Sequence, residues 1–189
     1  MGVLKTLTDE YFNDSIREED KIDISDLDVE IVSFTDKNNI FHKRGFRVKD
    51  SYDDDMAYTL KKLIERIIEK RGPECSLNDI DVSNQKKMCY EKNEIYGVFY
   101  NSSFNGDVSG WDVSSVEDMW SMFFDAESFN QDISGWNVSN VKDMSWMFSG
   151  AKSFNQDISR WDVSNVERMY GMFDYTPLEK NNKLPKWYK

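Results

Sequence analysis

The sequence predicts an α/β solenoid, a short array of strand–turn–helix coils that follows a capping helix and a small α+β region. Three observations predict it: a 25-residue repeat, an apolar spacing that changes within each repeat from strand-like to helical, and an amphipathic segment before the array. We expect residues 1–52 to form the α+β region and residues 53–189 to form the array with its caps.

The repeat is the strongest signal in the chain. Three segments align without gaps and begin at Phe104, Phe129 and Phe154, which predicts full coils at 104–128, 129–153 and 154–178. The recurring apolar side chains of the first coil are Phe104, Val108, Trp111, Val113, Val116, Met119, Met122 and Phe123. Equivalent apolar residues follow 25 and 50 positions later, so each coil contributes the same side chains to a shared core.

The spacing within a coil changes character. Ile133, Trp136 and Val138 follow the pattern L-x-x-L-x-L, which is the strand signature of leucine-rich repeats. Val141 is followed by apolar residues at offsets of three, six and seven, which places them on one face of a helix. Each coil is therefore expected to contain a short strand, a tight corner and about two turns of helix.

A serine precedes each expected helix. In the first and third coils a glutamate follows three residues later, as Ser114 with Glu117 and Ser164 with Glu167, and this spacing predicts a capping box. The middle coil has Lys142 instead and keeps only the serine. Asparagine and aspartate recur at the other corner, where we expect hydrogen bonds to turn backbone rather than a calcium site. These corner residues are Asn105, Asn130, Asn155, Asp107, Asp132 and Asp157.

The ends of the array have their own signals. A helix is expected at 54–71, because apolar residues recur at helical spacing from Leu60 to Ile68 and Gly72 follows. The aspartates at 53–55 favour the positive end of that helix. A degenerate coil is expected at 75–103, with an insertion between Met88 and Phe99. Residues 179–189 are expected to cap the last coil.

The amino-terminal region has a different pattern. We expect a short helix at about 8–18, a strand at 29–34, a turn at 36–39 and a return strand within 40–48. Whether this region is a separate small domain or an extension of the cap is left open.

Charge and composition exclude several classes of partner. The net charge of −11 argues against nucleic-acid binding and against anionic membranes, both of which need Lys and Arg, and it permits a basic protein partner. The two cysteines, Cys75 and Cys89, are expected to be reduced and buried, and the alternative is a disulfide that closes the small loop between them. No apolar run resembles a signal peptide or a membrane span, so a cytoplasmic location is expected. A surface location would require that an export signal had been removed.

The phrase FNQDISGWNVSNVKDMSWMF resembles the BspA-like leucine-rich repeat family, and the resemblance covers about residues 77–178. The resemblance implies a right-handed solenoid and a role in protein–protein or host-surface attachment. It brings no catalytic residues. This chain departs from the family in its short array and in having no recognisable export signal.

Catalytic patterns are missing from the sequence. The single histidine, His42, is expected to be an exposed strand residue. There is no Cys/His metal spacing, no glycine-rich phosphate loop and no G-x-S-x-G. We therefore expect no enzymatic activity, no cofactor and no metal. An enzyme would be favoured only by a pocket with converging polar groups in the amino-terminal region.

Five residues are candidates for contact with a partner. Asp112, Asn137 and Asp162, together with Arg160, alternate with buried residues and are expected to line the exposed strand face. Trp146 lies nearly opposite the buried helical face, so it is either an outward hot spot or packs on a neighbouring segment. Trp120 and Tyr170 flank the buried face and are expected to pack.

These features predict a non-enzymatic protein-interaction module. The alternative is an acidic inhibitor or decoy, encoded by a phage or another mobile element, that blocks a basic nucleic-acid-binding protein. The oligomeric state is left open.

Overall fold

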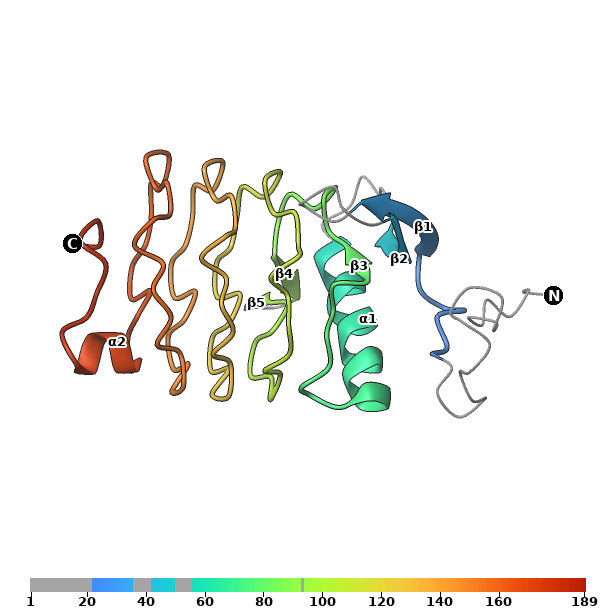
Figure 1. Ribbon diagram of the computed structural model, residues 1–189, viewed down its shortest axis with the longest axis horizontal. Helices are drawn as coiled ribbons and strands as arrows, with labels where there is room; N and C mark the ends of the chain where they lie inside the picture. The colour runs from blue at the N-terminus through green and yellow to red at the C-terminus, as the bar shows by residue number, and fades with distance from the viewer. Residues whose placement is uncertain (1–21, 36–41, 50–55, 93) are drawn as a thin grey trace.

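The computed structural model describes residues 22–35, 42–49, 56–92 and 94–189 (Figure 1). The elements, in order, are β1 (Val29–Thr35), β2 (His42–Val48), α1 (Met56–Arg71), β3 (Ile80–Asp81), β4 (Cys89–Lys92), β5 (Glu94–Gly97) and α2 (Pro177–Lys180). Within these ranges, no helix has the length and apolar character that crossing a membrane requires.

The predicted α/β solenoid of strand–turn–helix coils is wrong. The described residues contain two helices and two small sheets, and no helix or strand lies between residues 98 and 176, where the full coils were expected. That segment consists of turns and isolated bridges. The described chain is therefore a small mixed α/β protein.

The amino-terminal hairpin follows the two apolar runs of the sequence. β1 pairs antiparallel with β2, with Val29 opposite Val48. β2 also pairs in parallel with β3, where Phe46 lies opposite Ile80. This three-stranded sheet joins the hairpin to the segment that follows α1. The predicted helix at 8–18, the turn at 36–39 and the aspartates at 53–55 lie outside the described residues.

Helix α1 buries the stripe that its sequence predicts. Leu60, Leu63 and Ile67 are fully buried on one face, and Ile68 is partly buried beside them. The helix stops where Gly72 adopts a positive φ of 85° and donates its N–H to the carbonyl of Ile68 at 2.8 Å. A left-handed glycine directly after the last turn is a common helix terminus, because it has no Cβ to clash.

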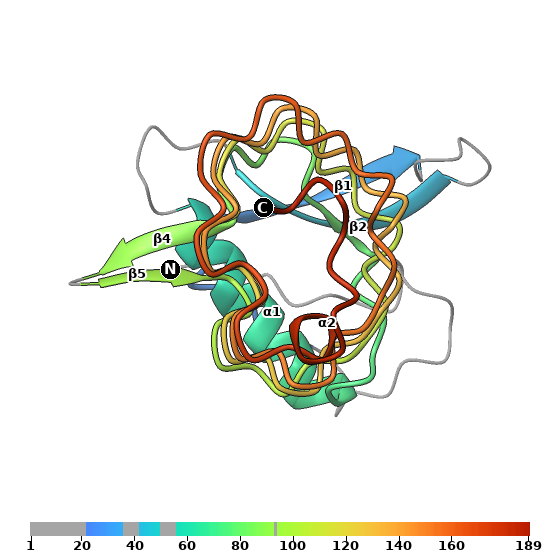
Figure 2. The same cartoon turned by 90° about the vertical axis from the view of Figure 1, so that its left-hand side faces the viewer.

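The three sequence repeats lie beside one another, and hydrogen bonds join equivalent positions. The N–H of Met119 donates to the carbonyl of Asp143 at 2.9 Å, and the N–H of Met144 donates to that of Arg168 at 2.8 Å. Parallel bridges connect the same segments. In Figure 2 the backbones of the repeats nearly superpose when the molecule is viewed from its C-terminal end.

The expected helices are missing because the backbone repeatedly leaves the helical region. Ser121, Trp146 and Gly171 occupy the same repeat position and have φ values of 51°, 52° and 58°. A right-handed helix cannot contain such residues. The N–H groups of Ser121 and Trp146 donate to the next repeat instead of back along the chain, so the apolar residues at offsets of three, six and seven lie on successive turns.

The capping-box prediction is wrong for the same reason, since no helix follows the serines. The N–H of Ser114 donates to Oδ1 of Asp112 at 3.0 Å. Glu117 instead forms an ion pair with Lys142 of the next repeat at 2.6 Å. The corner asparagines do bond turn backbone, because Oδ1 of Asn105 accepts the N–H of Asn130 at 2.9 Å.

Aromatic rings form the centre of the repeats. The rings of Trp111 and Trp136 stack with centroids 6.4 Å apart and planes inclined by 4°. Each indole N–H donates backwards, from Trp136 to the carbonyl of Val108 at 3.1 Å and from Trp161 to that of Ile133 at 3.2 Å. Buried tryptophan needs such a partner for its N–H, so these bonds fix the register as well as the packing.

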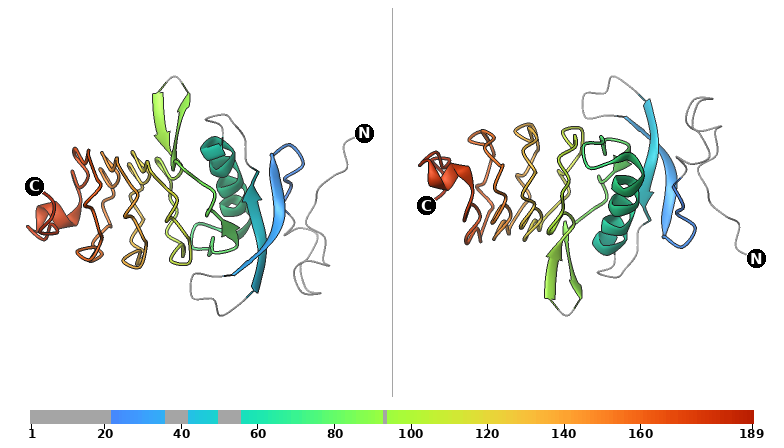
Figure 3. Two further views of the ribbon diagram at one scale, coloured as in Figure 1. Left: turned by 90° about the horizontal axis from the view of Figure 1, so that it is seen from above. Right: turned by 90° about the horizontal axis from the view of Figure 1, so that it is seen from below.

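Two additions complete the described structure. The expected insertion is the hairpin β4–β5, which projects sideways from the body in Figure 3. At the other end, Thr176 caps α2, and the chain after it returns over the last repeat. There the ring of Phe173 packs against Trp187 and Tyr188 at 6.2 and 5.0 Å. Leu178 is buried and Leu184 is partly buried, as expected for residues that cap the repeats.

Candidate partner-binding surface

Asp112, Asn137 and Asp162 lie at one corner of the three repeats, and we call them the turn row. All three are exposed. Each side-chain oxygen accepts the backbone N–H of the serine two residues later, at 3.0, 3.2 and 3.1 Å respectively. Hydrogen bonds from the side chain and then from the backbone of Ser164 lower the pKa of Asp162. One oxygen of each side chain thus holds the turn, while the exposed remainder faces solvent. The expected strand face is absent, so the row lies on turns.

Arg160 is also exposed, but it lies at a different corner of the repeats from the turn row. It lines a shallow pocket of about 230 Å³ with Asp132, Ser134, Gln156 and Asp157. The pKa of Asp157 is lowered by hydrogen bonds from Ser159, with a smaller effect from the charge of Arg160. The positive charge of Arg160 therefore lies among carboxylates, where it is partly balanced before any partner arrives.

The side chain of Trp146 lies next to residues of the repeats before and after its own. Its side chain is 38% exposed. One edge of its ring meets Trp120 of the preceding repeat, with centroids 5.6 Å apart and planes at 82°. On its other side is Gly171 of the following repeat, where an added Cβ would come within 2.6 Å of the indole Cδ1 and Nε1. Trp146 is therefore partly exposed and also packs on its neighbours. Its role as a hot spot stays a prediction.

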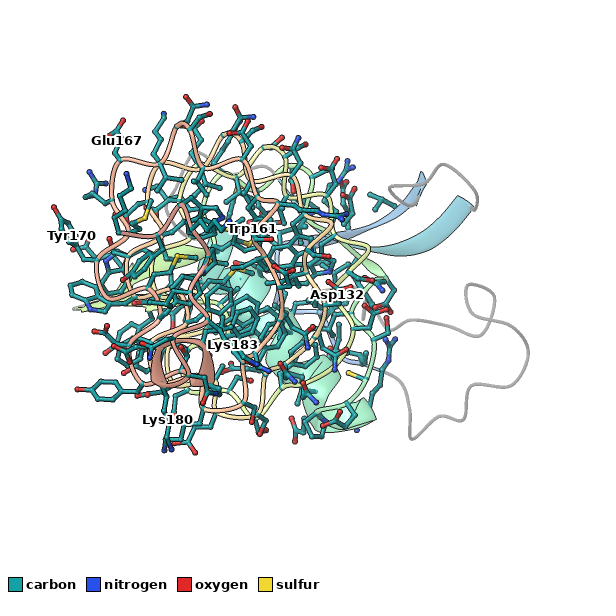
Figure 4. All side chains as sticks on the ribbon, turned by 60° about the vertical axis from the view of Figure 1, so that its left-hand side comes forward. Asp132, Trp161, Glu167, Tyr170, Lys180 and Lys183 are labelled. Atoms are coloured by element: carbon teal, nitrogen blue, oxygen red, sulfur yellow. The ribbon has the colours of Figure 1, made fainter. Side chains whose placement is uncertain are left out.

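Tyr170 is an exposed aromatic residue whose backbone lies next to that of Trp146. It is 68% exposed, so the expectation that it packs is wrong, whereas Trp120 is partly buried. The carbonyl of Tyr170 accepts the N–H of Trp146 at 2.7 Å, which fixes the two residues side by side. Figure 4 shows Tyr170 at the outer edge of the repeats, on the side opposite Asp132. We call Trp120, Trp146 and Tyr170 the aromatic face.

Ion pairs between repeats balance part of the surface charge. Glu117 pairs with Lys142, and Asp143 pairs with Arg168 at 2.8 Å. The hydrogen bond that Lys142 donates lowers the pKa of Glu117, and the hydrogen bond that Arg168 donates to Asp143 raises the pKa of Arg168. The Glu117–Lys142 pair is exposed and adds little stability, whereas the carboxylate of Asp143 in the second pair is buried.

The described residues offer little reactive chemistry. No group of three or more His, Cys, Asp or Glu side chains within the described ranges could hold a metal ion. Cys89 is buried, and burial raises the pKa of its thiol well above the ordinary value. The pKa of Cys75, a half-buried residue, is raised for the same reason. A protonated thiol is a poor nucleophile. The backbone of His42 lies in β2, but its side chain is outside the described structure.

A comparison with known protein families adds one finding. The family described as "Mycoplasma protein of unknown function, DUF285" matches residues 73–187. The chain belongs to the DUF285 family. The match begins directly after α1 and spans the degenerate segment, the three repeats and the C-terminal cap. Neither the curated proteins nor the solved structures contain a match.

Proposed function

We propose that this DUF285 protein is a non-enzymatic protein-binding module that contacts its partner through the aromatic face. The observation that carries the proposal is the exposure of Trp146 and Tyr170, two aromatic residues that are 38% and 68% exposed and are joined by a backbone hydrogen bond. Tryptophan and tyrosine are enriched among the residues that dominate binding energy at protein interfaces. An exposed pair of them on a regular scaffold suits such a contact.

The backbone supports the proposal, because it fixes where the two residues lie before binding. The N–H of Trp146 and the carbonyl of Tyr170 are bonded to each other, and Trp120 supports the indole from one edge. Residues that are already ordered lose less conformational freedom on binding. The aromatic face is therefore a pre-organised surface rather than a loop that must fold onto its partner.

The resemblance to BspA-like repeats agrees with this function, because it implies a role in protein–protein or surface attachment. In the finer form of the proposal, the turn row and Arg160 add polar contacts at the rim, where charge guides the approach of a basic partner. The cytoplasmic location expected from the sequence stays a prediction.

The test is a quantitative pull-down with the full chain as bait, in extracts of the cells that encode it. We expect Trp146→Ala to weaken capture of the main partner by about 30-fold, which corresponds to about 2 kcal/mol at a hot spot. Tyr175→Ala is the matched control, because Tyr175 is 79% exposed and is not part of the aromatic face. Equal loss with both variants, or no loss with Trp146→Ala, would contradict the proposal.

One observation favours a second candidate, the acidic decoy. Asp107, Asp132 and Asp157 occupy the same corner of three successive repeats, and the last two are exposed. A row of carboxylates at a regular spacing resembles a nucleic-acid backbone in charge. A decoy would compete with DNA for its partner, so binding that duplex DNA does not displace would exclude this candidate.

A further inference from the structure

The corner that begins each repeat holds a carboxamide in the same way twice. Nε2 of Gln131 donates to the backbone oxygen of Asn105 at 2.6 Å and to Oδ1 of the same residue at 3.2 Å. One repeat later, Nε2 of Gln156 donates to the same two oxygens of Asn130, at 2.7 and 3.1 Å. The asparagine at this corner therefore offers a pair of acceptors that fits one primary carboxamide.

The third repeat has the same pair of oxygens on Asn155, and this residue is exposed. Its backbone N–H donates to Oδ1 of Asn130 at 2.9 Å, so the residue takes its place in the repeat. No described residue donates a hydrogen bond to its backbone oxygen or to its Oδ1. Asn181, one repeat after Gln156, is the C-cap of α2 and does not reach this corner. The carboxamide position of the third repeat is therefore open.

Asn155 lines a pocket between the last repeat and the C-terminal tail, with a volume of about 750 Å³. Pockets of this size are in the range that holds small molecules. One wall is the corner at 155–159, and the other is formed by residues 183–186 of the tail together with Leu178. Leu178 and Pro185 are buried and supply apolar surface for a short hydrocarbon chain. In Figure 2 the tail runs inside the outline of the repeats.

Charged groups of opposite sign lie on the two walls of the pocket. Lys183 and Lys186 belong to the tail wall, and both are exposed. Neither lysine forms an ion pair with a described residue. Asp157 belongs to the corner wall, and hydrogen bonds from Ser159 lower its pKa, so its carboxylate is ionised at neutral pH. The pocket therefore suits a ligand that carries both a negative and a positive charge.

The corner wall also has a carbonyl with room for another donor. The carbonyl of Ile133 accepts two bonds, from the N–H of Trp136 at 3.0 Å and from the indole N–H of Trp161 at 3.2 Å. The equivalent carbonyl of Ile158 accepts only the N–H of Trp161, at 3.1 Å. The indole nitrogen of Trp187 in the tail is buried and has no acceptor among the described residues, so it does not take the second position.

We propose that this pocket binds free L-glutamine. The carboxamide of the ligand donates to the backbone oxygen and to Oδ1 of Asn155, as the glutamines of the earlier repeats do to their asparagines. Its ammonium group lies at the carbonyl of Ile158 and the carboxylate of Asp157. Its carboxylate lies at Lys183 and Lys186. A glutamine inside a peptide lacks both charges, and one at the carboxyl end lacks the ammonium, so the free amino acid is the ligand that uses every group.

The test is an NMR titration of the full ¹⁵N-labelled chain with L-glutamine. We expect saturable shifts of the amides of Asn155, Ile158 and Lys183, with a Kd of about 1 mM or tighter, as is usual for a ligand of this size. L-Glutamate is the matched control, because it has the same shape but has no N–H to donate to Asn155, and it should give no saturable shifts. The peptide Ala-Ala-Gln should bind at least about fivefold more weakly, because it lacks the ammonium next to Asp157.

Substitutions test the two ends of the ligand separately. Asn155→Ala removes Oδ1 but retains the backbone N–H that bonds Asn130, so the variant should fold and bind L-glutamine about fivefold more weakly. Lys183→Gln should weaken binding by about threefold or more. Lys180→Gln is the matched control, because Lys180 is an exposed lysine of the same segment that does not line the pocket.

Three results would overturn the proposal. These are no saturable shift at about 20 mM L-glutamine, binding of L-glutamate as tight as that of L-glutamine, and equal loss with Lys180→Gln and Lys183→Gln. The pocket shares no residue with the aromatic face, so either result leaves the proposed protein-binding function to its own test.

Discussion

Replacing Trp136 by alanine tests whether the stacked indoles carry the stability of the repeats. Trp136 is 4% exposed, stacks on Trp111, and donates its indole N–H to the carbonyl of Val108. Truncating a buried tryptophan costs about 3–5 kcal/mol, and the value includes the cavity left behind. We expect a loss of about 4 kcal/mol, which lowers the melting temperature by about 8–16 °C for a chain of this size.

The assay is urea denaturation and thermal melting followed by circular dichroism, so that the changed tryptophan content does not affect the signal. Trp146→Ala is the matched control. Its side chain is 38% exposed and makes one edge-to-face contact, which is worth about 0.5–1.5 kcal/mol. If Trp146→Ala costs as much as Trp136→Ala, or if Trp136→Ala costs less than about 1 kcal/mol, our assignment of inner and outer tryptophans is refuted.

Three further predictions follow from close contacts and from charge. Gly171→Ala should destabilise the fold by about 1 kcal/mol or more, because alanine is strained at the positive φ of this position and its Cβ would clash with Trp146. In the Trp146→Ala background the clash is absent, so the cost of Gly171→Ala should fall. A double-mutant cycle of urea midpoints measures this difference. The pKa of Asp26 is lowered from 3.8 to about 2 by hydrogen bonds from Arg66. The stabilisation from the ionised Asp26 carboxylate is therefore complete above about pH 4 and is lost as the pH falls through 2. The free energies of unfolding of Asp26→Asn and of the wild type should differ slightly at pH 7 and converge near pH 2. Cys89, which is buried with a raised pKa, should react with iodoacetamide at pH 8 much more slowly than half-buried Cys75, as measured by mass spectrometry of the native protein.

Much of the local structure could be predicted from the sequence. The amphipathic stripe from Leu60 to Ile68 lies in a helix whose end agrees with its signal, since Gly72 follows it with a positive φ. The aspartates expected at its start lie outside the described residues. The two apolar runs around the predicted turn pair as β1 and β2. The period of 25 also held, because hydrogen bonds join residues one repeat apart.

The fold class could not be predicted, because two backbone conformations share one apolar pattern. Offsets of three, six and seven after Val141 suit a helix, but they suit successive tight turns equally well. The deciding feature is the positive φ of Trp146, a conformation that tryptophan rarely adopts. The useful signal was Gly171 at the equivalent repeat position, since a glycine aligned with larger residues often marks a left-handed site.

The candidate surface was predictable only in part. The exposure of Trp146 and of the turn row follows from their places between buried residues. Tyr170 was misplaced, because its side chain was assigned to the flank of a helix that does not exist. The N–H groups at 169, 171 and 173 have no acceptor among the described residues, and side-chain patterns do not reveal this, because it depends on which backbone lies next to them.

The indole hydrogen bonds between repeats also bear on the order in which the chain can fold during synthesis. Trp111, Trp136 and Trp161 each donate to a carbonyl that comes earlier in the chain. During synthesis on the ribosome, every acceptor has therefore left the exit tunnel before its indole arrives. A nascent chain can close these bonds one after another as it lengthens, and none of these tryptophans waits for an acceptor that has not yet been translated.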